Sequence, residues 1–319
     1  MLQKDRIEFV VPVYNESDCL DELMRRLLVL RREMLEAEIS IIFVNDGSQD
    51  GSLIKLVECA HRYPFVRVIN FSRNFGHQAA VTAGLDHADA EYVCIIDADL
   101  QDAPELVKPM YEKAKKENLN VVYGQRCQRK GESVFKIVTA KIFYKLLQRL
   151  CSIDLPADTG DFRLIDRKVF QAMRQMREAH RFLRGIVPWV GFRSAPLLYD
   201  RDSRYAGKTK YPFRKMANFA IDGVLSFSNK PLRLASYIGF SIAVSGFIGL
   251  SYMIGLRLFT HQIVPGITVV LTAILLVGGA QLLMLGLLGE YVGRLFEQSK
   301  NRPLYLVDFT LNLDKKFQG

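Results

Sequence analysis

The first part of the chain alternates short apolar runs with longer segments of helical periodicity. The apolar runs occupy residues 7–13, 39–44, 66–71 and 92–96, and the segments between them place leucines and alanines at helical spacing among charged residues. Strands that alternate with helices predict crossover connections and a mostly parallel sheet. We therefore expect an α/β domain, with a further strand at 120–124.

Two long stretches near the other end of the chain contain no charged residue. They run from Arg233 to Arg257 and from Arg257 to Glu290. At about 1.5 Å per helical residue, roughly 20 residues cross a hydrocarbon core of about 30 Å. Two buried helices of a soluble core are the alternative, but helices that are apolar all round are more typical of membranes. We predict a transmembrane hairpin at 233–295, with helices near 234–257 and 264–289.

Basic residues on both flanks predict how this hairpin is oriented. Lysines and arginines lie before the first stretch and after the second, which places both flanks in the cytoplasm. They are Arg214, Lys215, Lys230, Arg233, Arg294, Lys300 and Arg302. Because no run of signal-peptide length leads the chain, we expect the domain at 1–232 and the tail at 296–319 to be cytoplasmic.

Composition narrows the class of protein. A chain of 319 residues with 49% hydrophobic and 24% charged residues is neither disordered nor a small disulfide scaffold. The five cysteines are widely spaced and form no CxxC pair, so neither a zinc site nor a disulfide framework is indicated. These features, with the hairpin, favour a membrane-anchored protein with a large intracellular domain.

The positive charge is concentrated in two segments, 126–149 and 193–215, which together outweigh the formal net charge of +9 of the whole chain. Such patches suit nucleic acid or anionic lipid, and the neighbouring hairpin favours lipid headgroups or a phosphate-bearing lipid. Apolar residues at helical spacing among these charges predict amphipathic interfacial helices near 134–151 and 213–228. Helices packed on the sheet are the alternative.

Polar clusters follow three of the predicted strands, at Pro12–Glu16, Asn45–Ser48 and Asp97–Asp99. In parallel sheets, ligands bind beyond the carboxyl ends of the strands, so these clusters should converge. Two carboxylates two residues apart can hold Mg²⁺ or Mn²⁺, which prefer carboxylate and phosphate oxygens. A lone Asp-x-Asp also fits a turn or a helix N-cap.

The motifs resemble family 2 glycosyltransferases. Pro12-Val13-Tyr14-Asn15-Glu16, Val44-Asn45-Asp46-Gly47-Ser48 and Asp97-Ala98-Asp99-Leu100-Gln101-Asp102 match the nucleotide-sugar-binding half of that family in order and spacing. The polyprenyl-phosphate branch is matched by Ser72-Arg73-Asn74-Phe75-Gly76, Asp158-Thr159-Gly160-Asp161-Phe162-Arg163, Arg204 to Lys210 and Leu288-Gly289-Glu290-Tyr291-Val292-Gly293-Arg294. Within that branch the chain is most similar to bacterial bactoprenol (undecaprenyl-phosphate) glucosyltransferases, relatives of the dolichol-phosphate mannose synthases. The resemblance implies the GT-A fold, an inverting mechanism and a bacterial inner-membrane location.

The resemblance also implies roles for particular residues. A UDP-sugar would contact Pro12, Tyr14, Asn15, Glu16, Asp46, Asp97 and Gln101. Asp97 and Asp99 would hold Mg²⁺ or Mn²⁺, and Asp161 and Asp99 would be the catalytic carboxylates. Arg126, Arg204 and Lys210 would bind the acceptor phosphate.

The role of Asp161 is open at this point. The resemblance implies a general base, but a lipid phosphate with a second pKa near 6 is mostly dianionic at pH 7 and hardly needs one. Asp161 would then orient the sugar or support the metal. Asp158 and Asp161 as caps of the following helix are the structural alternative.

The leading hypothesis is therefore transfer of a sugar, glucose first, from a UDP-sugar to undecaprenyl phosphate for modification of a cell-surface glycan such as O-antigen. Mannose or an aminoarabinose derivative is the alternative within the class, and a non-catalytic membrane sensor of nucleotide sugars is the alternative outside it. A polysaccharide synthase is disfavoured because the chain lacks Gln-x-x-Arg-Trp. The resemblance implies a homo-oligomer, with a tetramer as one candidate, whereas the small residues of the hairpin fit packing within one chain equally well.

Overall fold

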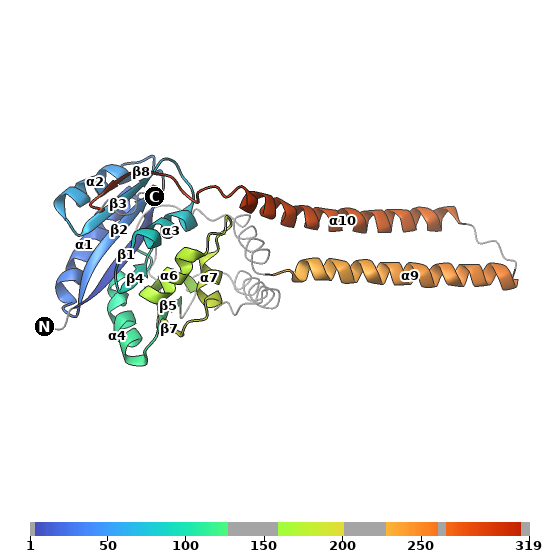
Figure 1. Ribbon diagram of the computed structural model, residues 1–319, viewed down its shortest axis with the longest axis horizontal. Coiled ribbons are helices and arrows are strands. Elements are labelled where there is room, and N and C mark those ends of the chain that lie inside the picture. Colours follow the sequence, from blue (N-terminus) through green and yellow to red (C-terminus); the bar gives the residue numbers. More distant parts are fainter. Residues whose placement is uncertain (1–3, 127–158, 201–227, 261–265, 314–319) are drawn as a thin grey trace.

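The computed structural model describes residues 4–126, 159–200, 228–260 and 266–313. Their centre is an eight-stranded mixed sheet in the order β7-β5-β6-β4-β1-β2-β3-β8 (Figure 1). The strands are β1 Asp5–Val13, β2 Ala37–Asn45, β3 Val66–Phe71, β4 Tyr92–Ile95, β5 Val121–Arg126, β6 Thr159–Asp166, β7 Ser194–Tyr199 and β8 Val307–Leu311. The first four run parallel to one another, as their alternation with helices predicted.

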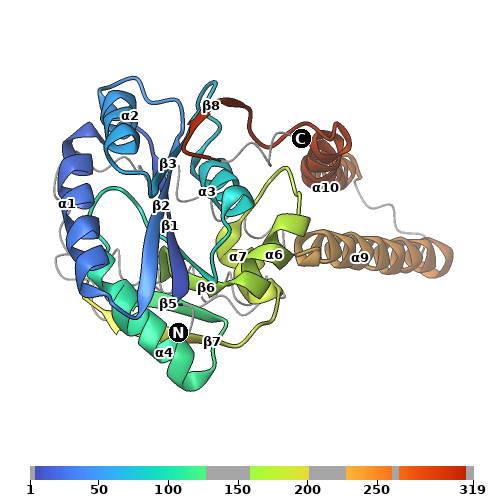
Figure 2. The same cartoon turned by 60° about the vertical axis from the view of Figure 1, so that its left-hand side comes forward.

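Helices cover both faces of this sheet (Figure 2). One face carries α1 Ser17–Glu33, α2 Ser52–Arg62 and α4 Val107–Glu117, the last preceded by a 3₁₀ turn at Pro104–Leu106. The other face carries α3 His77–His87, α6 Arg167–Gln175 and α7 Leu183–Trp189. Because β1 and β2 lie between these layers, nearly all of their side chains are buried, which explains why their sequences read as continuous apolar runs.

Two strands enter the sheet against the parallel direction. β6 lies between β4 and β5 and is antiparallel to both. β8 comes from the C-terminal segment and pairs antiparallel with β3 at the edge. β8 was not predicted from the sequence, where 296–319 was expected to be a cytoplasmic tail. The resulting Rossmann-like mixed sheet is that of the GT-A fold, as expected.

Two long helices leave the domain side by side, α9 Lys230–Thr260 and α10 Ile267–Ser299 (Figure 1). A Cβ placed on Gly239 of α9 would lie 3.3 Å from Met284 Cε of α10, so the helices touch. Segments long and apolar enough to cross a membrane occupy Lys230–Gly249 and Ala273–Ser299, and none of their residues is buried in the protein. These helices form the candidate hairpin. The helices predicted near 134–151 and 213–228 lie outside the described residues, apart from Ser228.

Candidate functional site

The three polar clusters do converge at one edge of the sheet. Neighbouring parallel strands β4, β1 and β2 end together there, and the backbone N–H of Asp46 donates to the carbonyl of Val13 at 2.9 Å. On the other side of β1, the N–H of Ile96 donates to the carbonyl of Val10 at 3.1 Å. The loops that follow β4, β1 and β2 therefore begin close together, and one ligand can contact all three loops.

The turn after β4 presents acidic side chains from a tight backbone. Leu100 has a φ of +60°, in the left-handed region that a leucine rarely adopts, and the N–H of Gln101 donates to Asp99 Oδ1 at 3.2 Å. Asp99 and Asp102 are buried, and the Tyr199 hydroxyl donates to Asp102. Such strain persists where surrounding structure imposes it, and it is common at functional sites.

Asp97 has more negatively than positively charged groups as neighbours. Burial raises the pKa of its carboxyl to about 6, and repulsion from Asp161, Asp99 and Asp102 adds to the rise, while His77 opposes it. A cation at this position would therefore be stabilised by several carboxylates.

Asp161 lies inside β6, not at a helix end, and faces the turn after β4 across the site. Its carboxylate accepts two hydrogen bonds from Arg184 of α7, from Nε at 2.9 Å and from an Nη at 3.1 Å. Although burial raises the pKa of Asp161, Arg184 and His77 hold it well below its usual range. The capping role belongs instead to Asp166, whose Oδ1 accepts the N–H of Val169 at 3.0 Å.

His77 lies between the carboxylates of Asp97 and Asp161. It is the first residue of α3, and its Nε2 lies 3.3 Å from Asp161 Oδ2 and 3.6 Å from Asp97 Oδ1. Burial lowers the pKa of His77, but the two carboxylates outweigh this effect and raise it to about 9. The imidazole is therefore a cation at neutral pH, held between Asp97 and Asp161.

Neither His77 nor Arg184 was among the residues predicted from the sequence. His77 directly follows the quoted Ser72–Gly76 motif, and that position was the available signal. Arg184 sits in an apolar helix without a motif of its own, and only the packing of α7 against β6 brings it to Asp161.

The Asp46 carboxylate holds the loop that precedes α3. Its oxygens accept the N–H of Phe75 at 2.6 Å and the N–H of Gly76 at 3.0 Å, while burial raises its pKa against the effect of those bonds. The next residue, Gly47, has a φ of +66°, and a Cβ there would lie 2.5 Å from the backbone nitrogen of Asn74. Asp46 and Gly47 thus fix the loop that leads to His77.

The loop after β1 is braced by the loop after β2. The N–H of Asn15 donates to the Ser48 hydroxyl at 3.0 Å, and Asn15 Oδ1 accepts the N–H of Gln49 at 2.8 Å. Glu16 is bound through its N–H to Ser52 at 3.0 Å, while the ring of Tyr14 is exposed. Pro12 differs, because it is buried within β1 and pairs with Val44.

Of the three predicted acceptor-binding cations, the structure describes only Arg126. It ends β5 beside β6, and a Cβ placed on Gly160 would lie 3.3 Å from an Arg126 Nη. Its Nε is buried and has no hydrogen-bond partner in the described part of the chain. Arg204 and Lys210 lie outside the described residues.

The residues present fit a divalent metal that substrate helps to coordinate. No group of three His, Cys, Asp or Glu side chains able to enclose a metal occurs among the residues that the structure describes. Mg²⁺ and Mn²⁺ commonly bind one or two carboxylates together with substrate phosphates, so a complete protein cage is not required. Asp97 and Asp99 supply such a partial set.

Comparison with known proteins identifies the family to which the sequence is similar. The family model for glycosyl transferase family 2 matches residues 8–174. The chain is 47% identical to the uncharacterized glycosyltransferase YkcC of Bacillus subtilis, over 96% of this chain and 94% of that protein. It is 36% identical to a bactoprenol glucosyl transferase of Shigella phage SfV, over 95% of this chain and 98% of that protein. Among solved structures, S. aureus TarS 1-349 in complex with UDP-GlcNAc matches with a TM-score of 0.48 and 16% identity, over 70% of this chain and 67% of that one.

Proposed function

Since this chain belongs to glycosyltransferase family 2, we propose that it transfers a sugar from a UDP-sugar to undecaprenyl phosphate at the cytoplasmic face of the bacterial inner membrane. Glucose is the first candidate for the sugar. The observation that carries the proposal is the match to bactoprenol glucosyl transferase, which extends through the hairpin and covers 95% of this chain. A match confined to the sheet domain would support only the family's general sugar transfer.

The reaction needs little proton transfer. An oxygen of the acceptor phosphate attacks the anomeric carbon of the sugar, the bond from that carbon to the β-phosphate oxygen breaks, and UDP leaves with the electron pair. Because the second pKa of a phosphate monoester is about 6, the attacking oxygen is already mostly deprotonated at pH 7. In-line attack inverts the anomeric centre and gives a β-linked product from an α-linked donor.

In this scheme Asp161 positions other groups. A carboxylate whose pKa lies well below its usual range is a weak base, which disfavours proton removal from the acceptor. Its ionised oxygens instead hold Arg184 and His77 in place. Both cations can then face the donor phosphates or the developing charge on UDP.

Asp97 and Asp99 would hold the Mg²⁺ or Mn²⁺ that is typical of the family. When bound, such an ion supplies positive charge that neutralises the leaving diphosphate. Gln101 is fixed next to these residues by the bond from its N–H to Asp99, and the loops at Tyr14, Asn15, Glu16 and Asp46 border the same edge of the sheet.

Arg126 is placed to bind the acceptor phosphate. An arginine can donate two parallel hydrogen bonds to phosphate oxygens, and the buried Nε of Arg126 offers a donor without a partner in the described residues. Arg204 and Lys210 are proposed as further phosphate ligands on the strength of their motif alone.

The test is transfer by the purified full-length protein in detergent. We expect radiolabel from one UDP-sugar, with UDP-glucose first, to enter the organic phase with undecaprenyl phosphate and Mg²⁺ or Mn²⁺, and to stop doing so in EDTA. Asp97→Asn should abolish transfer, whereas Asp18→Asn, an exposed change on α1, should not. Transfer of label from a UDP-sugar other than UDP-glucose would support the proposed reaction and identify a different sugar.

Two outcomes of this assay would contradict the proposed function. If no UDP-sugar is transferred although UDP still binds the wild-type protein, the proposed reaction is wrong and a nucleotide-sugar sensor becomes the better description. If transfer occurs but Asp97→Asn retains it, the assignment of the acidic turn is wrong.

A further inference from the structure

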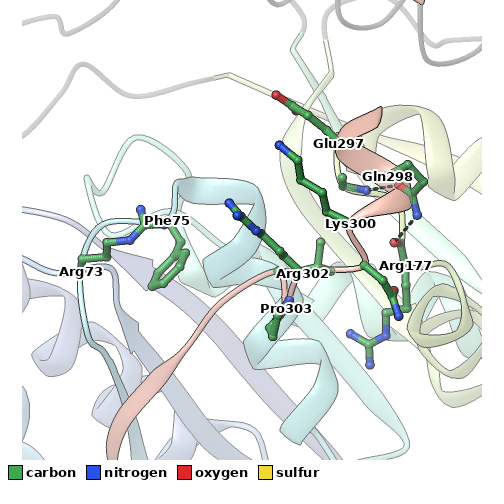
Figure 3. A pocket seen from close by; sticks show the side chains of 11 residues that line it. Arg73, Phe75, Arg177, Glu297, Gln298, Lys300, Arg302 and Pro303 are labelled. Atoms are coloured by element: carbon green, nitrogen blue, oxygen red, sulfur yellow. Dashed lines mark hydrogen bonds between the residues drawn. The ribbon is translucent and has the colours of Figure 1, made fainter. Parts of the chain in front are cut away.

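A cavity of about 270 Å³ lies where the end of α10 meets the sheet domain, apart from the carboxylates of the proposed site (Figure 3). Its walls come from the loop before α3, the segment after α6 and the segment that joins α10 to β8. The charged side chains of its lining, with one aromatic ring, are Arg73, Phe75, Arg177, Glu297, Lys300 and Arg302. Nothing in the proposed reaction uses this cavity.

Three cations of the lining form no ion pair with a carboxylate among the described residues, namely Arg73, Lys300 and Arg302. Arg73 stacks its guanidinium 4.0 Å from the centre of the Phe75 ring, and Lys300 lies 4.2 Å from the centre of the Phe296 ring. Figure 3 shows Lys300 and Arg302 extending toward the side of the cavity where Phe75 lies. Gathering these charges around one space costs repulsion that a bound anion would relieve.

The other charged side chains of the lining are already paired. Arg177 contacts Asp86 at 2.7 Å, and Glu297 contacts His180 at 2.6 Å. Glu297 is the one carboxylate of the lining, against Arg73, Arg177, Lys300 and Arg302, so the charge around the cavity is positive. The cations without an ion pair come from two segments of the chain, the loop before α3 and the segment after α10. This chemistry suits phosphate oxygens, which accept several charge-assisted hydrogen bonds at once.

The position of the cavity suggests where that phosphate comes from. The candidate membrane segment of α10 ends at Ser299, and Lys300 and Arg302 follow it directly. The uncharged part of α10 ends before Glu290, and the exposed side chains of Leu295 and Phe296 continue its apolar surface toward the cavity. A bilayer crossed by α10 would therefore turn the phosphate layer of its domain-side leaflet toward the cavity. Basic pockets at the ends of membrane helices bind anionic headgroups.

The end of α10 is also firmly attached to the domain. Gln298 accepts the N–H of Ala179 at 2.7 Å, and Tyr305 stacks on Phe71 with ring centres 5.1 Å apart. The hydroxyl of Tyr305 donates to Asp86 at 2.8 Å. The cavity is thus part of a fixed joint between the hairpin and the sheet.

We propose that this cavity binds a phosphate group, either that of an anionic phospholipid headgroup or free phosphate. The proposal rests on the proposed function for the membrane setting of the hairpin. Arg73 lies in the loop that Asp46 holds and that leads to His77, so an anion bound there would also steady one wall of the catalytic site.

The test measures binding without turnover. The midpoint of thermal unfolding of the full-length protein in neutral detergent is followed with dihexanoyl phosphatidylglycerol, dihexanoyl phosphatidylcholine or inorganic phosphate at equal ionic strength. We expect phosphatidylglycerol to raise the midpoint and phosphatidylcholine to have no effect. The double variant Lys300→Gln with Arg302→Gln should bind roughly tenfold more weakly or worse.

A matched control removes two exposed charges elsewhere, Arg32→Gln with Lys116→Gln, and should respond as the wild type does. Stabilisation by inorganic phosphate at the same concentration as phosphatidylglycerol would support the site and assign it to free phosphate. No response of the wild type to either anion, or an undiminished response of the Lys300/Arg302 variant, would overturn the proposal.

Addition of UDP with Mg²⁺ separates this inference from the proposed function. If the Lys300/Arg302 variant keeps its response to UDP and loses only the response to the lipid, the cavity is a separate site. If it loses the response to UDP as well, the cavity belongs to the donor site and the inference fails. A wild type that binds lipid but transfers no sugar would refute the proposed reaction alone.

Discussion

Asp161 can stay ionised within β6 because two cations from other elements reach it, Arg184 from α7 and His77 from α3. A carboxylate buried without partners would have a raised pKa or destabilise the fold. The guanidinium of Arg184 supplies both charge and orientation, since it donates one hydrogen bond to each oxygen of the carboxylate. The geometry of the site therefore depends on a residue that no sequence motif marks.

Replacement of Arg184 tests this dependence. Arg184→Ala should lower the turnover rate about a hundredfold, because a small displacement of catalytic groups has effects of that size. Arg184→Lys keeps the charge but not the fork, and should fall between the alanine variant and the wild type. The measurement is the initial transfer rate together with UDP affinity, which reports whether Arg184 also faces the donor phosphates.

A conservative change elsewhere provides the control. Arg32→Lys on the exposed side of α1 should leave the rate unchanged. A wild-type rate in Arg184→Ala would show that the ion pair with Asp161 has no part in the reaction.

Gly47 offers a second test, because two features of the structure require glycine at this position. Its φ of +66° disfavours any side chain, and a Cβ would lie 2.6 Å from the carbonyl carbon of Arg73. We expect Gly47→Ala to lower the thermal midpoint by about 5 °C or more. Gly51→Ala is the matched control, since its φ is −72° and the nearest atom, Ser17 Cβ, would be 3.9 Å away. An equal loss in both variants would contradict the close approach of the two loops.

Helix α4 is tied to the start of β1 by polar contacts. Asp5 of β1 accepts a hydrogen bond from the Tyr111 hydroxyl at 2.8 Å and contacts Lys115 at 2.5 Å. Burial raises the pKa of Asp5, but the hydrogen bonds from Lys115 and Tyr111 outweigh it and hold the pKa below its usual range. The ionised carboxylate is therefore favoured more in the folded state than in the unfolded one.

This shift predicts how pH affects stability. A carboxyl with a lowered folded pKa stabilises the fold above its unfolded pKa of about 4, and the contribution disappears as pH falls through the folded pKa. We expect Asp5→Asn to cost about 0.5–1 kcal/mol at pH 7, after screening by solvent, and less at pH 3. Thermal unfolding of the full chain in detergent at both pH values measures the difference. A cost that is equal at the two pH values would show that the ion pair contributes nothing.

The elements that sequence could predict are those with local signals. The apolar run at 66–71 coincides with β3, and the helical spacing of leucines coincides with α1. In both segments the order of apolar and polar residues itself shows which side chains become buried. β6 and β8 carry no comparable signal, since each is defined by antiparallel pairing with a strand distant in sequence. The same holds within the site. The residues after parallel strands were predictable from their motifs, whereas Arg184 depends on how α7 packs.

For the proposed reaction, the sheet domain must lie on one defined side of the membrane that the hairpin would cross. The acceptor phosphate and the UDP-sugar can meet only if the edge of the sheet near Asp97 faces the same aqueous phase as the acceptor headgroup. Basic residues flank both helices on the domain side, and such residues stay in the cytoplasm. The short connection between α9 and α10 should then lie on the opposite side.

Cysteine labelling in intact bacterial cells tests this arrangement. In a background with the native cysteines replaced by serine, Thr260→Cys at the end of α9 should react with a membrane-impermeant maleimide added outside. Glu117→Cys, exposed at the end of α4, should react only after the cells are broken. If both positions react before lysis, the domain lies outside and cannot use cytoplasmic UDP-sugar. If neither reacts until lysis, the two helices do not cross the membrane, and the lipid acceptor must reach the site without a hairpin to anchor the enzyme.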